Sequence, residues 1–315
     1  MKAYFSMAYG GPDKSLLGDL PDPVPGKNQL LVEVRAASIN PVDYKVKRGD
    51  LKFLSGSKFP KIVGSDFAGI VKSVPEGVVH LAPGDRVYGV VSVLFGKQGT
   101  LAGLVAVEAN RVSKIPDGLS FSEAASLPVA ALTALNGIRR CRVKAGTPVL
   151  INGSTGGVGH FAVQIARARD AVVTATCRPE NNDFVRNLGA DETAGYGEAL
   201  LSGPTQKFDA IFDAYGTMPL GTIRRLLRRG GVYASTIPSP ARFFMSLPMR
   251  LLFGIKLTSA NMRAMPEDFA ELESLIANGK LTPVIEYPFT FDSVRSAFAL
   301  AEKGGFRGKI VVTME

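Results

Sequence analysis

The chain has 315 residues, 46% of them hydrophobic, so it can bury one large core or two moderate ones, and usual domain sizes favour two. Its formal net charge is +9 at pH 7. Lys and Arg are spread along the chain, densest at 139–142 and 224–229, and no aromatic stacking motif accompanies them, which argues against a nucleic-acid partner.

The first residues alternate in polarity, with Ala3, Phe5 and Met7 as the apolar positions, and lack the charged-then-apolar order of a signal peptide. Two cysteines are too few for a disulfide framework and fit a reducing compartment, so we expect a cytoplasmic protein. Further along, residues 1–121 hold short apolar runs separated by turns rich in Pro and Gly. The runs lie at 30–35, 69–74, 86–91 and 104–108, and this spacing predicts a barrel-like β domain.

From Ser122 onward, helical patterns alternate with short apolar runs, which is typical of a parallel sheet built from βαβ units. The predicted strands lie at 148–151, 171–176, 209–212, 231–236 and 255–260. An amphipathic helix is then predicted over 266–280, followed by a strand at 284–285, a helix over 294–302 and a strand at 309–313. From periodicity alone, these last elements either extend the parallel sheet or return to the first domain.

A glycine-rich turn joins the predicted strand at 148–151 to a helical pattern that begins near Val158. Ser154 stands where the first glycine of the G-x-G-x-x-G fingerprint would fall, and Gly156 and Gly159 fill the other two places. Glycines let the backbone approach a pyrophosphate, and the N–H groups at a helix start favour its negative charge. The sequence therefore predicts a dinucleotide-binding loop.

Three further segments accompany this loop: Ile39-Asn-Pro-Val-Asp43, Ala82-Pro-Gly-Asp-Arg-Val87 and Leu127-Pro-Val-Ala-Ala-Leu-Thr-Ala134. Together they resemble the medium-chain dehydrogenase/reductase superfamily, in its zinc-independent quinone oxidoreductase branch, and most closely the alkenal/enone reductases and the chloroplast-envelope quinone oxidoreductase homologue. The resemblance implies an α/β fold, with a Rossmann-type doubly wound parallel sheet and a GroES-like β-barrel catalytic domain. It implies the catalytic domain at 1–121, the Rossmann domain at 122–265 and a return to the catalytic domain at 266–315.

The resemblance also bears on metal binding, because many relatives are zinc alcohol dehydrogenases. Asn40 stands where their catalytic cysteine would be, and Ser65 stands where their histidine would be. The four-cysteine structural lobe is absent, and two cysteines and two histidines, widely spaced, do not make a tetrahedral zinc site. We therefore expect no metal, and hydride donation to an electron-poor acceptor rather than alcohol oxidation.

The candidate catalytic residues are Asn40, Tyr44 and Lys45, in the segment that the family places on the substrate side. Lys45 matches the lysine that related enone reductases hold beside the nicotinamide and its ribose, where an ammonium would stabilise a developing enolate oxygen. The alternatives are a solvated loop lysine for Lys45, a turn residue before Pro41 for Asn40, and a pocket-lining residue rather than an acid for Tyr44. Asp43 is expected to fix the loop by hydrogen bonding.

The expected cofactor is NADPH. No acid occupies 176–178 to accept from a ribose 2′-hydroxyl, while Arg178 and Tyr196 match positions that reach a 2′-phosphate. A nearby Glu180, a merely exposed arginine or a packed tyrosine are the alternatives. The full set of expected cofactor contacts is Lys45, Thr133, Ser154, Thr155, Gly156, Gly157, Val158, Thr176, Cys177, Arg178, Tyr196, Asp213, Ala214 and Asn261.

These features predict an NADPH-dependent, metal-independent oxidoreductase that transfers hydride to a quinone or to the C=C bond of an α,β-unsaturated carbonyl. The alternative is a non-catalytic NADPH-binding redox sensor or structural protein. We expect a homodimer through the edge strand at 255–260. The apolar segment 243–253 is interpreted as a sheet-covering or dimer-interface helix, with a substrate lid or membrane-surface patch as alternatives. Membrane association is therefore possible but not expected. The sequence leaves the acceptor and the proton donor open.

Overall fold

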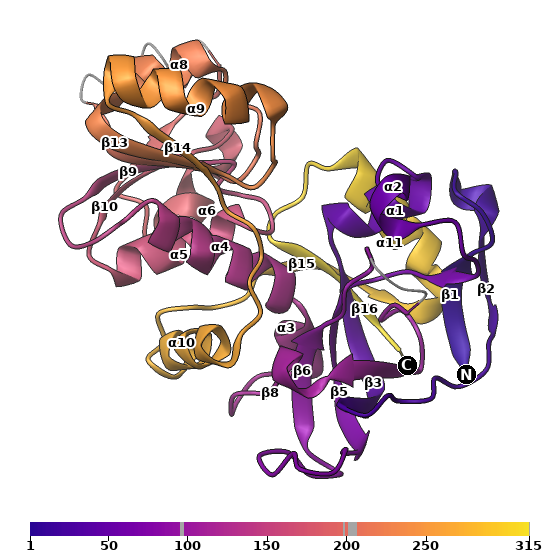
Figure 1. Ribbon diagram of the computed structural model, residues 1–315. Helices are drawn as coiled ribbons and strands as arrows, with labels where there is room; N and C mark the ends of the chain where they lie inside the picture. The colour runs from indigo at the N-terminus through magenta and orange to yellow at the C-terminus, as the bar shows by residue number, and fades with distance from the viewer. Residues whose placement is uncertain (95–97, 198, 201–206, 315) are drawn as a thin grey trace. The chain divides into compact units, whose positions relative to one another are not determined.

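The computed structural model describes residues 1–94, 98–197, 199–200 and 207–314 (Figure 1). The chain divides into two compact units. Unit 1 comprises Met1–Val129, Ala264–Ala270 and Pro283–Glu315, and unit 2 comprises Ala130–Arg263 and Glu271–Thr282. The first division falls at 129/130 rather than at the expected 121/122, because the helix at 121–125 packs on the strands at 29–39 and 66–73 of unit 1. After the expected 265/266 boundary, residues 271–282 belong to unit 2 instead of unit 1.

Unit 1 contains a seven-stranded sheet in the order β15-β16-β3-β5-β6-β8, with β7 also paired to β3, and a three-stranded sheet in the order β2-β1-β4. The strands are β1 (Lys2–Ser6), β2 (Ser15–Asp19), β3 (Gln29–Ile39), β4 (Lys61–Ile62), β5 (Asp66–Ser73), β6 (Arg86–Val90), β7 (Leu104–Glu108), β8 (Val112–Lys114), β15 (Ile285–Thr290) and β16 (Lys309–Thr313). The α-helices are α1 (Pro41–Arg48), α2 (Lys52–Ser55), α3 (Phe121–Ala125) and α11 (Val294–Lys303), with 3-10 turns at Pro12–Lys14, Ala109–Arg111 and Phe291–Ser293.

Strand β3 organises unit 1. Its alternate residues Leu30, Val32 and Val34 are buried, as a half-buried strand requires. It pairs antiparallel with β5 and β7, and the C-terminal strand β16 also pairs with it, Ile310 opposite Ile39. The end of the chain therefore returns to the sheet of unit 1.

The strand predicted at 284–285 is longer than the sequence indicated, since β15 continues through Pro288. The predicted strand ended before Pro288, because proline lacks the backbone N–H that a strand uses for pairing. The observed strand lies at the edge of its sheet, where a missing donor is tolerated.

Unit 2 contains a six-stranded sheet in the order β11-β10-β9-β12-β13-β14, and all pairings are parallel. This order reverses direction beside β9, as in a doubly wound dinucleotide-binding sheet, so the predicted fold class is confirmed. The strands are β9 (Pro148–Asn152), β10 (Val172–Thr176), β11 (Glu192–Ala194), β12 (Phe208–Asp213), β13 (Leu227–Ser235) and β14 (Lys256–Ser259). The α-helices are α4 (Pro128–Arg140), α5 (Gly159–Ala168), α6 (Asn182–Asn187), α8 (Leu220–Leu226), α9 (Pro240–Phe253) and α10 (Pro266–Ala277), with a 3-10 turn at Pro179–Asn181. The first residues of α4 and of α10, 128–129 and 266–270, belong to unit 1.

Helices cover the sheet of unit 2 on both faces: α8 and α9 lie on one face, and α4 and α5 lie on the other (Figure 1). The core beneath α8 and α9 is formed by buried apolar side chains that include Ile211, Ile223, Tyr233 and Met249. Strand β13 begins earlier than predicted, at Leu227, because its first residues include exposed arginines that hide the apolar pattern.

Candidate active site

The glycine loop of unit 2 runs from the end of β9 to the start of α5. Gly153 has φ +80°, which an L side chain rarely adopts, and a Cβ on Gly159 would lie 2.0 Å from the Gly153 carbonyl oxygen. A Cβ on Gly156 would meet only that same oxygen, at 3.7 Å. Gly153 and Gly159 therefore close the turn, whereas the missing side chain of Gly156 leaves space beside the loop.

This loop presents donors suited to an anion. In the described part of the chain, no acceptor pairs with the backbone N–H groups of Gly157 and Val158, which precede the first residue of α5. The positive end of the helix dipole lies at the same point. Unpaired N–H groups, a helix start and the space beside Gly156 together fit a pyrophosphate.

Two expected cofactor residues shape the loop from within. The Ser154 hydroxyl donates to the carbonyl oxygen of Thr176 on β10, at 2.7 Å. The Thr176 hydroxyl donates to Oδ1 of Asn152, at 2.8 Å, and accepts from the backbone N–H of Gly153, at 3.0 Å. Both side chains are buried, so they fix the loop against β10; their contact with a cofactor stays a prediction.

Asp213, at the end of β12, is fully buried. Its carboxylate oxygens accept four hydrogen bonds: from the Asn152 amide at 2.7 Å, the Gly216 N–H at 2.7 Å, the Met218 N–H at 2.9 Å and the Tyr233 hydroxyl at 2.8 Å. Burial and the Asp213 charge raise the pKa of Tyr233, so its hydroxyl stays protonated and donating. Asp213 thus joins three neighbouring strands at their carboxyl ends and has its acceptors occupied internally.

Two other predicted residues lie beside these strands. Cys177 is buried, burial raises the pKa of its thiol, and the thiol donates to Oδ1 of Asn182 at 3.2 Å, toward α6. Ala214 is half-buried and its backbone bonds to Asn152 and Thr236. Their role in cofactor binding stays a prediction.

The two residues expected at a 2′-phosphate, Arg178 and Tyr196, lie at the same end of β10 as the alternative ribose contact, Glu180. Arg178 is exposed directly after the strand. The hydroxyl of Tyr196 donates to the carbonyl oxygen of Thr176 at 3.1 Å. Burial raises the pKa of Tyr196, while a hydrogen bond with Thr155 and the positive charge of Arg178 oppose the increase. Glu180 is also exposed in the turn that follows β10.

Thr133 and Asn261 come from segments that meet inside unit 2. Thr133 is buried in α4, one turn before Asn136. The Asn136 amide donates to the backbone carbonyl of Asn261 at 2.6 Å, and Asn261 itself is exposed. Their predicted contact with a nicotinamide is untested by this geometry.

In unit 1, helix α1 carries the three candidate catalytic residues. Asn40 is the N-cap, and its backbone N–H donates to the carboxylate of Asp43 at 2.7 Å, so Asp43 fixes this turn as expected. Tyr44 is half-buried, with the Arg48 guanidinium 5.3 Å from its ring centre. Lys45 is half-buried, and no residue that the structure describes pairs with its ammonium group.

The side chain of Asn40 belongs to a buried polar cluster centred on Lys309. The Lys309 ammonium, 3% exposed, donates to Oδ1 of Asn40 at 2.6 Å and lies 3.5 Å from the carboxylate of Asp66. Asp66 also accepts from the Asn40 amide at 2.7 Å and from the Ser38 hydroxyl at 2.8 Å. Both ends of the Asn40 amide are therefore engaged within unit 1.

The cluster extends to two further groups. Asp66 accepts from the backbone N–H of Val129, at 2.9 Å, in the first turn of α4. Asp43 accepts from the Ser65 hydroxyl at 2.5 Å. Burial raises the pKa of Asp43 to about 7, against the hydrogen bonds from Ser65 and Asn40, and burial lowers the pKa of Lys309.

Lys309 was not among the residues assigned from the sequence. The available signal was a lysine at the start of an otherwise apolar strand, preceded by a glycine. A Cβ on Gly308 would lie 2.1 Å from the carbonyl oxygen of Val284, so only glycine fits beside that backbone. Lys309 and Asp66 stand out because both are buried, and hydrophobic periodicity in the sequence does not reveal the burial of a charged side chain.

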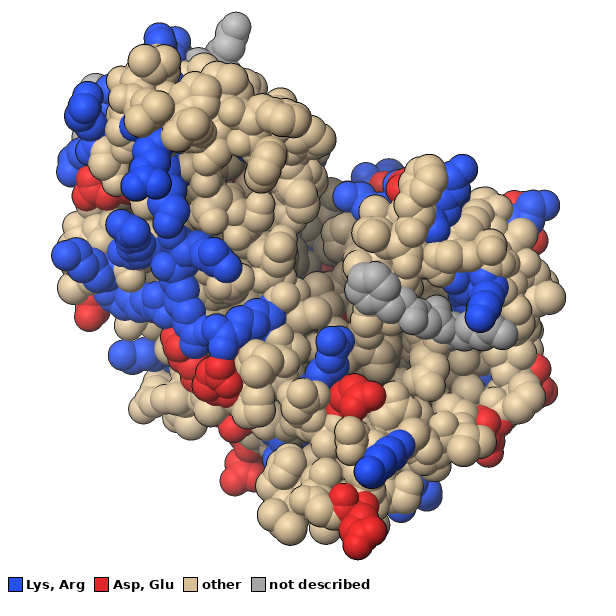
Figure 2. Space-filling view, viewed as in Figure 1, with Lys and Arg blue, Asp and Glu red and all other residues tan. Residues whose placement is uncertain are grey.

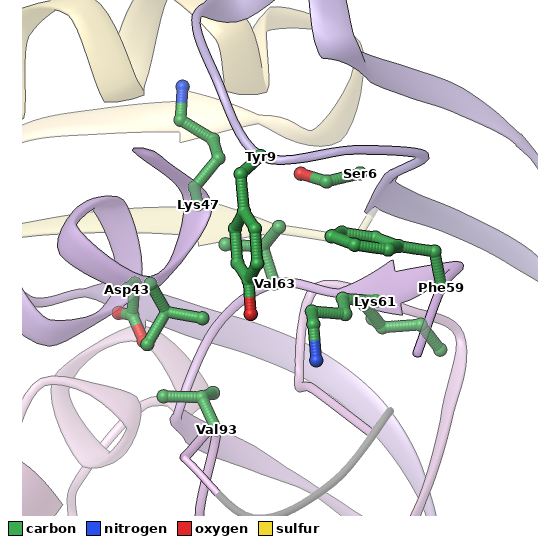
Figure 3. A pocket seen from close by; sticks show the side chains of 10 residues that line it. Ser6, Tyr9, Asp43, Lys47, Phe59, Lys61, Val63 and Val93 are labelled. Atoms are coloured by element: carbon green, nitrogen blue, oxygen red, sulfur yellow. The ribbon is translucent and has the colours of Figure 1, made fainter. Parts of the chain in front are cut away.

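A small cavity lies beside Asp43 (Figure 3). Tyr9 and Lys61 line it, and both bond to Ser55: the hydroxyls of Tyr9 and Ser55 lie 2.7 Å apart, and the Lys61 ammonium donates to the Ser55 carbonyl at 2.5 Å. Its volume of about 10 Å³ admits at most one water molecule. This cavity is therefore too small to hold an organic acceptor.

A doubly wound sheet with an anion-binding glycine loop, joined to a β domain, defines a pyridine-nucleotide-dependent oxidoreductase. Residues 26–117 match the alcohol dehydrogenase GroES-like domain, and residues 188–312 match the zinc-binding dehydrogenase family. The chain belongs to the medium-chain dehydrogenase/reductase family, in its quinone oxidoreductase branch, and is an oxidoreductase enzyme. The resemblance inferred from the sequence is confirmed.

Individual relatives support this placement. The chain is 32% identical to the chloroplast envelope quinone oxidoreductase homolog of Arabidopsis thaliana, over 97% of this chain and 96% of that protein. It is also 32% identical to the chloroplastic NADPH-dependent alkenal/one oxidoreductase of the same plant, over 99% of this chain and 79% of that protein. The solved quinone oxidoreductase of Coxiella burnetii is 30% identical and superposes with a TM-score of 0.90, over 100% of this chain and 99% of that one.

One matched family is described as zinc-binding, but the residues present do not fit zinc. Asn40 and Ser65 replace a thiolate and an imidazole, and the amide oxygen of Asn40 already accepts from Lys309. Among the residues that the structure describes, no three His, Cys, Asp or Glu side chains lie together as a ligand set. The Cys141 thiol is buried in unit 2, where burial raises its pKa to about 12.

Proposed function

We propose that this enzyme is an NADPH-dependent, metal-independent reductase that transfers hydride to a quinone or to the C=C bond of an α,β-unsaturated carbonyl. The observation that carries the proposal is the engagement of Asn40, Ser65 and Asp66 in a hydrogen-bonded cluster around Lys309. Without a Lewis acid, an alcohol is not polarised for oxidation, whereas a conjugated carbonyl already accepts hydride. The names of the relatives above support the same acceptor classes.

In this proposal, NADPH supplies the hydride when it is bound. The N–H groups of Gly157 and Val158 hold the pyrophosphate, and Arg178 and Tyr196 hold the 2′-phosphate. Lys45 has an ammonium group available to stabilise negative charge that develops on the acceptor oxygen. Tyr44 is the candidate proton donor.

The test of the proposed function is a screen of quinones, enals and enones with NADPH and NADH under identical conditions. We expect turnover with NADPH, unchanged by chelators and without stoichiometric zinc in elemental analysis. A redox sensor or structural protein would bind NADPH and show negligible steady-state oxidation with every acceptor. One tightly held zinc per chain would contradict the metal-independent mechanism.

Lys45→Ala should lower kcat more than it weakens cofactor binding, because its charge matters most as the acceptor oxygen becomes negative. Loss of such a group typically raises the barrier by about 2 to 4 kcal/mol. Lys45→Arg should retain more activity than Lys45→Ala. Lys52→Ala, a matched loss of a nearby exposed lysine, is the control. An unchanged kcat in Lys45→Ala would leave Lys45 as a solvated lysine.

Arg178→Ala should weaken NADPH binding and leave NADH binding nearly unchanged. A guanidinium that meets a phosphate contributes roughly 1.5 to 3 kcal/mol, equivalent to about tenfold to a hundredfold preference for NADPH. Tyr196→Phe should act in the same direction more mildly, and Arg186→Ala on the adjacent helix α6 is the control. Fluorescence titration with both cofactors measures the effect; equal losses for both cofactors would favour Glu180 as the ribose contact.

We also propose a cytoplasmic homodimer that forms through β14. This strand is the edge of the six-stranded sheet and pairs only with β13 among the strands that the structure describes, so its outer backbone groups can extend the sheet. Light scattering at micromolar concentration measures this state. No described helix is long and apolar enough to cross a bilayer. Because several relatives are named for chloroplasts or mitochondria, the cellular location stays a prediction.

A further inference from the structure

Helix α9 exposes the side chains that a helix of a globular protein normally buries. Phe243, Phe244, Leu247, Leu251 and Leu252 are each at least 63% exposed. Met249 is the buried residue of the helix, and it joins the core beneath α9. Apolar residues therefore occupy both the inner side and the outer side of this helix, which departs from the usual amphipathic pattern.

The exposed apolar side chains form one continuous surface. Phe243, Leu247 and Leu251 are spaced four residues apart, so they lie along one stripe of the helix, and Phe244 borders it. Arg250 is the exposed charged residue of α9. A contiguous apolar surface of this kind marks an interaction site.

Positive charge is concentrated around the same helix. Residues 214–266 contain eight of the 37 Lys and Arg and none of the 28 Asp and Glu, so this segment supplies +8 of the formal net charge of +9. The Arg224 guanidinium lies 5.0 Å from the ring centre of Phe253, and the Arg229 side chain passes beside Gly254 at the end of α9. Figure 2 shows a tan surface over α8 and α9 with Lys and Arg gathered beside it.

We propose that the exposed face of α9 docks on the surface of an anionic phospholipid bilayer, with the helix lying in the plane of the interface. The combination of apolar side chains and a cationic border matches acyl chains and anionic headgroups, respectively. At 14 residues, α9 is shorter than the roughly 20 residues that span a bilayer, so it lies on the membrane. This assignment adopts the membrane-surface alternative that the sequence left open for residues 243–253.

The same charges argue against the other occupants. A second copy that seated its own α9 on this face would bring the cationic borders of two such helices together, with Arg229 and Arg250 of each copy, whereas the dimer proposed above joins backbone groups at the edge of β14. The exposed side chains of α9 are mostly aliphatic or phenyl and form few hydrogen bonds. They therefore suit acyl chains better than a protein interface, which surrounds its apolar core with a hydrogen-bonding polar rim. No residue of α9 is among the expected cofactor contacts, so the docking proposal does not rest on the proposed reaction.

The absence of tryptophan from the chain allows a direct test. Phe244→Trp introduces a single fluorescent reporter on the exposed face of α9, and Phe53→Trp, on a 93% exposed site in unit 1, is the matched control. The probe is a vesicle of phosphatidylcholine and phosphatidylglycerol in equal amounts, compared with phosphatidylcholine alone. We expect Phe244→Trp to shift its emission to the blue and to be quenched by brominated acyl chains with anionic vesicles, and Phe53→Trp to show neither change.

Vesicle co-sedimentation separates the two contributions. Leu247→Gln/Leu251→Gln should weaken binding about tenfold or more, because less apolar area enters the acyl region. Arg229→Gln/Arg250→Gln should weaken it about fivefold for each charge, an effect that added salt reduces. Lys27→Gln/Lys58→Gln, a loss of two exposed lysines in unit 1, should leave binding unchanged. All variants should retain wild-type turnover of a water-soluble acceptor.

Four results would overturn the proposal. If no vesicle bound, α9 would not be a membrane-docking surface. If neutral and anionic vesicles bound equally, anionic headgroups would play no part in docking. A blue-shifted Phe244→Trp emission without vesicles, together with a dimer that Leu247→Gln/Leu251→Gln dissociates in light scattering, would assign α9 to a second copy of the chain. Equal losses in the lysine control would assign the binding to general charge.

Discussion

Lys309→Met should lower the free energy of unfolding of unit 1 by about 3 to 5 kcal/mol. The substitution removes the cation of a buried ion pair and leaves the fully buried Asp66 with only its hydrogen bonds from Ser38, Asn40 and Val129. It also removes the donor to Oδ1 of Asn40, which leaves a buried amide oxygen without that hydrogen bond. The two losses act on one cluster, so the effect should exceed that of a typical surface substitution.

Urea unfolding combined with amide hydrogen exchange of β3 and β16 measures this loss within unit 1. Lys303→Met, which removes an exposed lysine at the end of α11, is the control. The double variant Lys309→Met/Asp66→Asn should lose less than the sum of the two single variants, because no buried charge is left unpaired. Additive losses, or a loss below about 1 kcal/mol for Lys309→Met, would mean that the pair contributes little.

Gly156→Ala and Gly159→Ala should separate cofactor binding from folding. Gly156→Ala has room within the protein and should keep wild-type stability, yet its methyl group enters the space left for the pyrophosphate. We expect NADPH affinity to fall at least about tenfold. Gly159→Ala would place a Cβ 2.0 Å from the Gly153 carbonyl oxygen, so the loop must shift, and stability should fall by about 3 kcal/mol.

Thermal melting and cofactor titration on both variants make the comparison. Gly221→Ala, at an open position on α8 where a Cβ meets no neighbour, is the matched control. If Gly156→Ala bound NADPH as tightly as the wild type, the space beside this glycine would not be where the pyrophosphate lies. If Gly159→Ala melted at the wild-type temperature, the contact of Gly159 with the Gly153 carbonyl oxygen would not limit the stability of the loop.

Local patterns in the sequence were sufficient to identify the fold class and the family. The glycine loop, the apolar runs of unit 2 and their helical connections depend on residues near one another in the chain, so spacing alone reveals them. No strand order was predicted from the sequence, and β11 was not among the five predicted strands, because three residues are too few to show a periodic pattern. The boundaries were less accurate where Pro288 or exposed arginines interrupted the apolar pattern.

Tertiary structure alone decided the rest, because it brings together residues that are distant in sequence. The pairing of β16 with β3 places Lys309 against Asn40 and Asp66, a contact that no local periodicity encodes. The apolar composition of 243–253 predicts a buried helix, but composition does not show which of its side chains pack on the protein and which face solvent. Only the packing of α9 on β14 decides that Met249 is buried while Phe243 and Leu251 face outward.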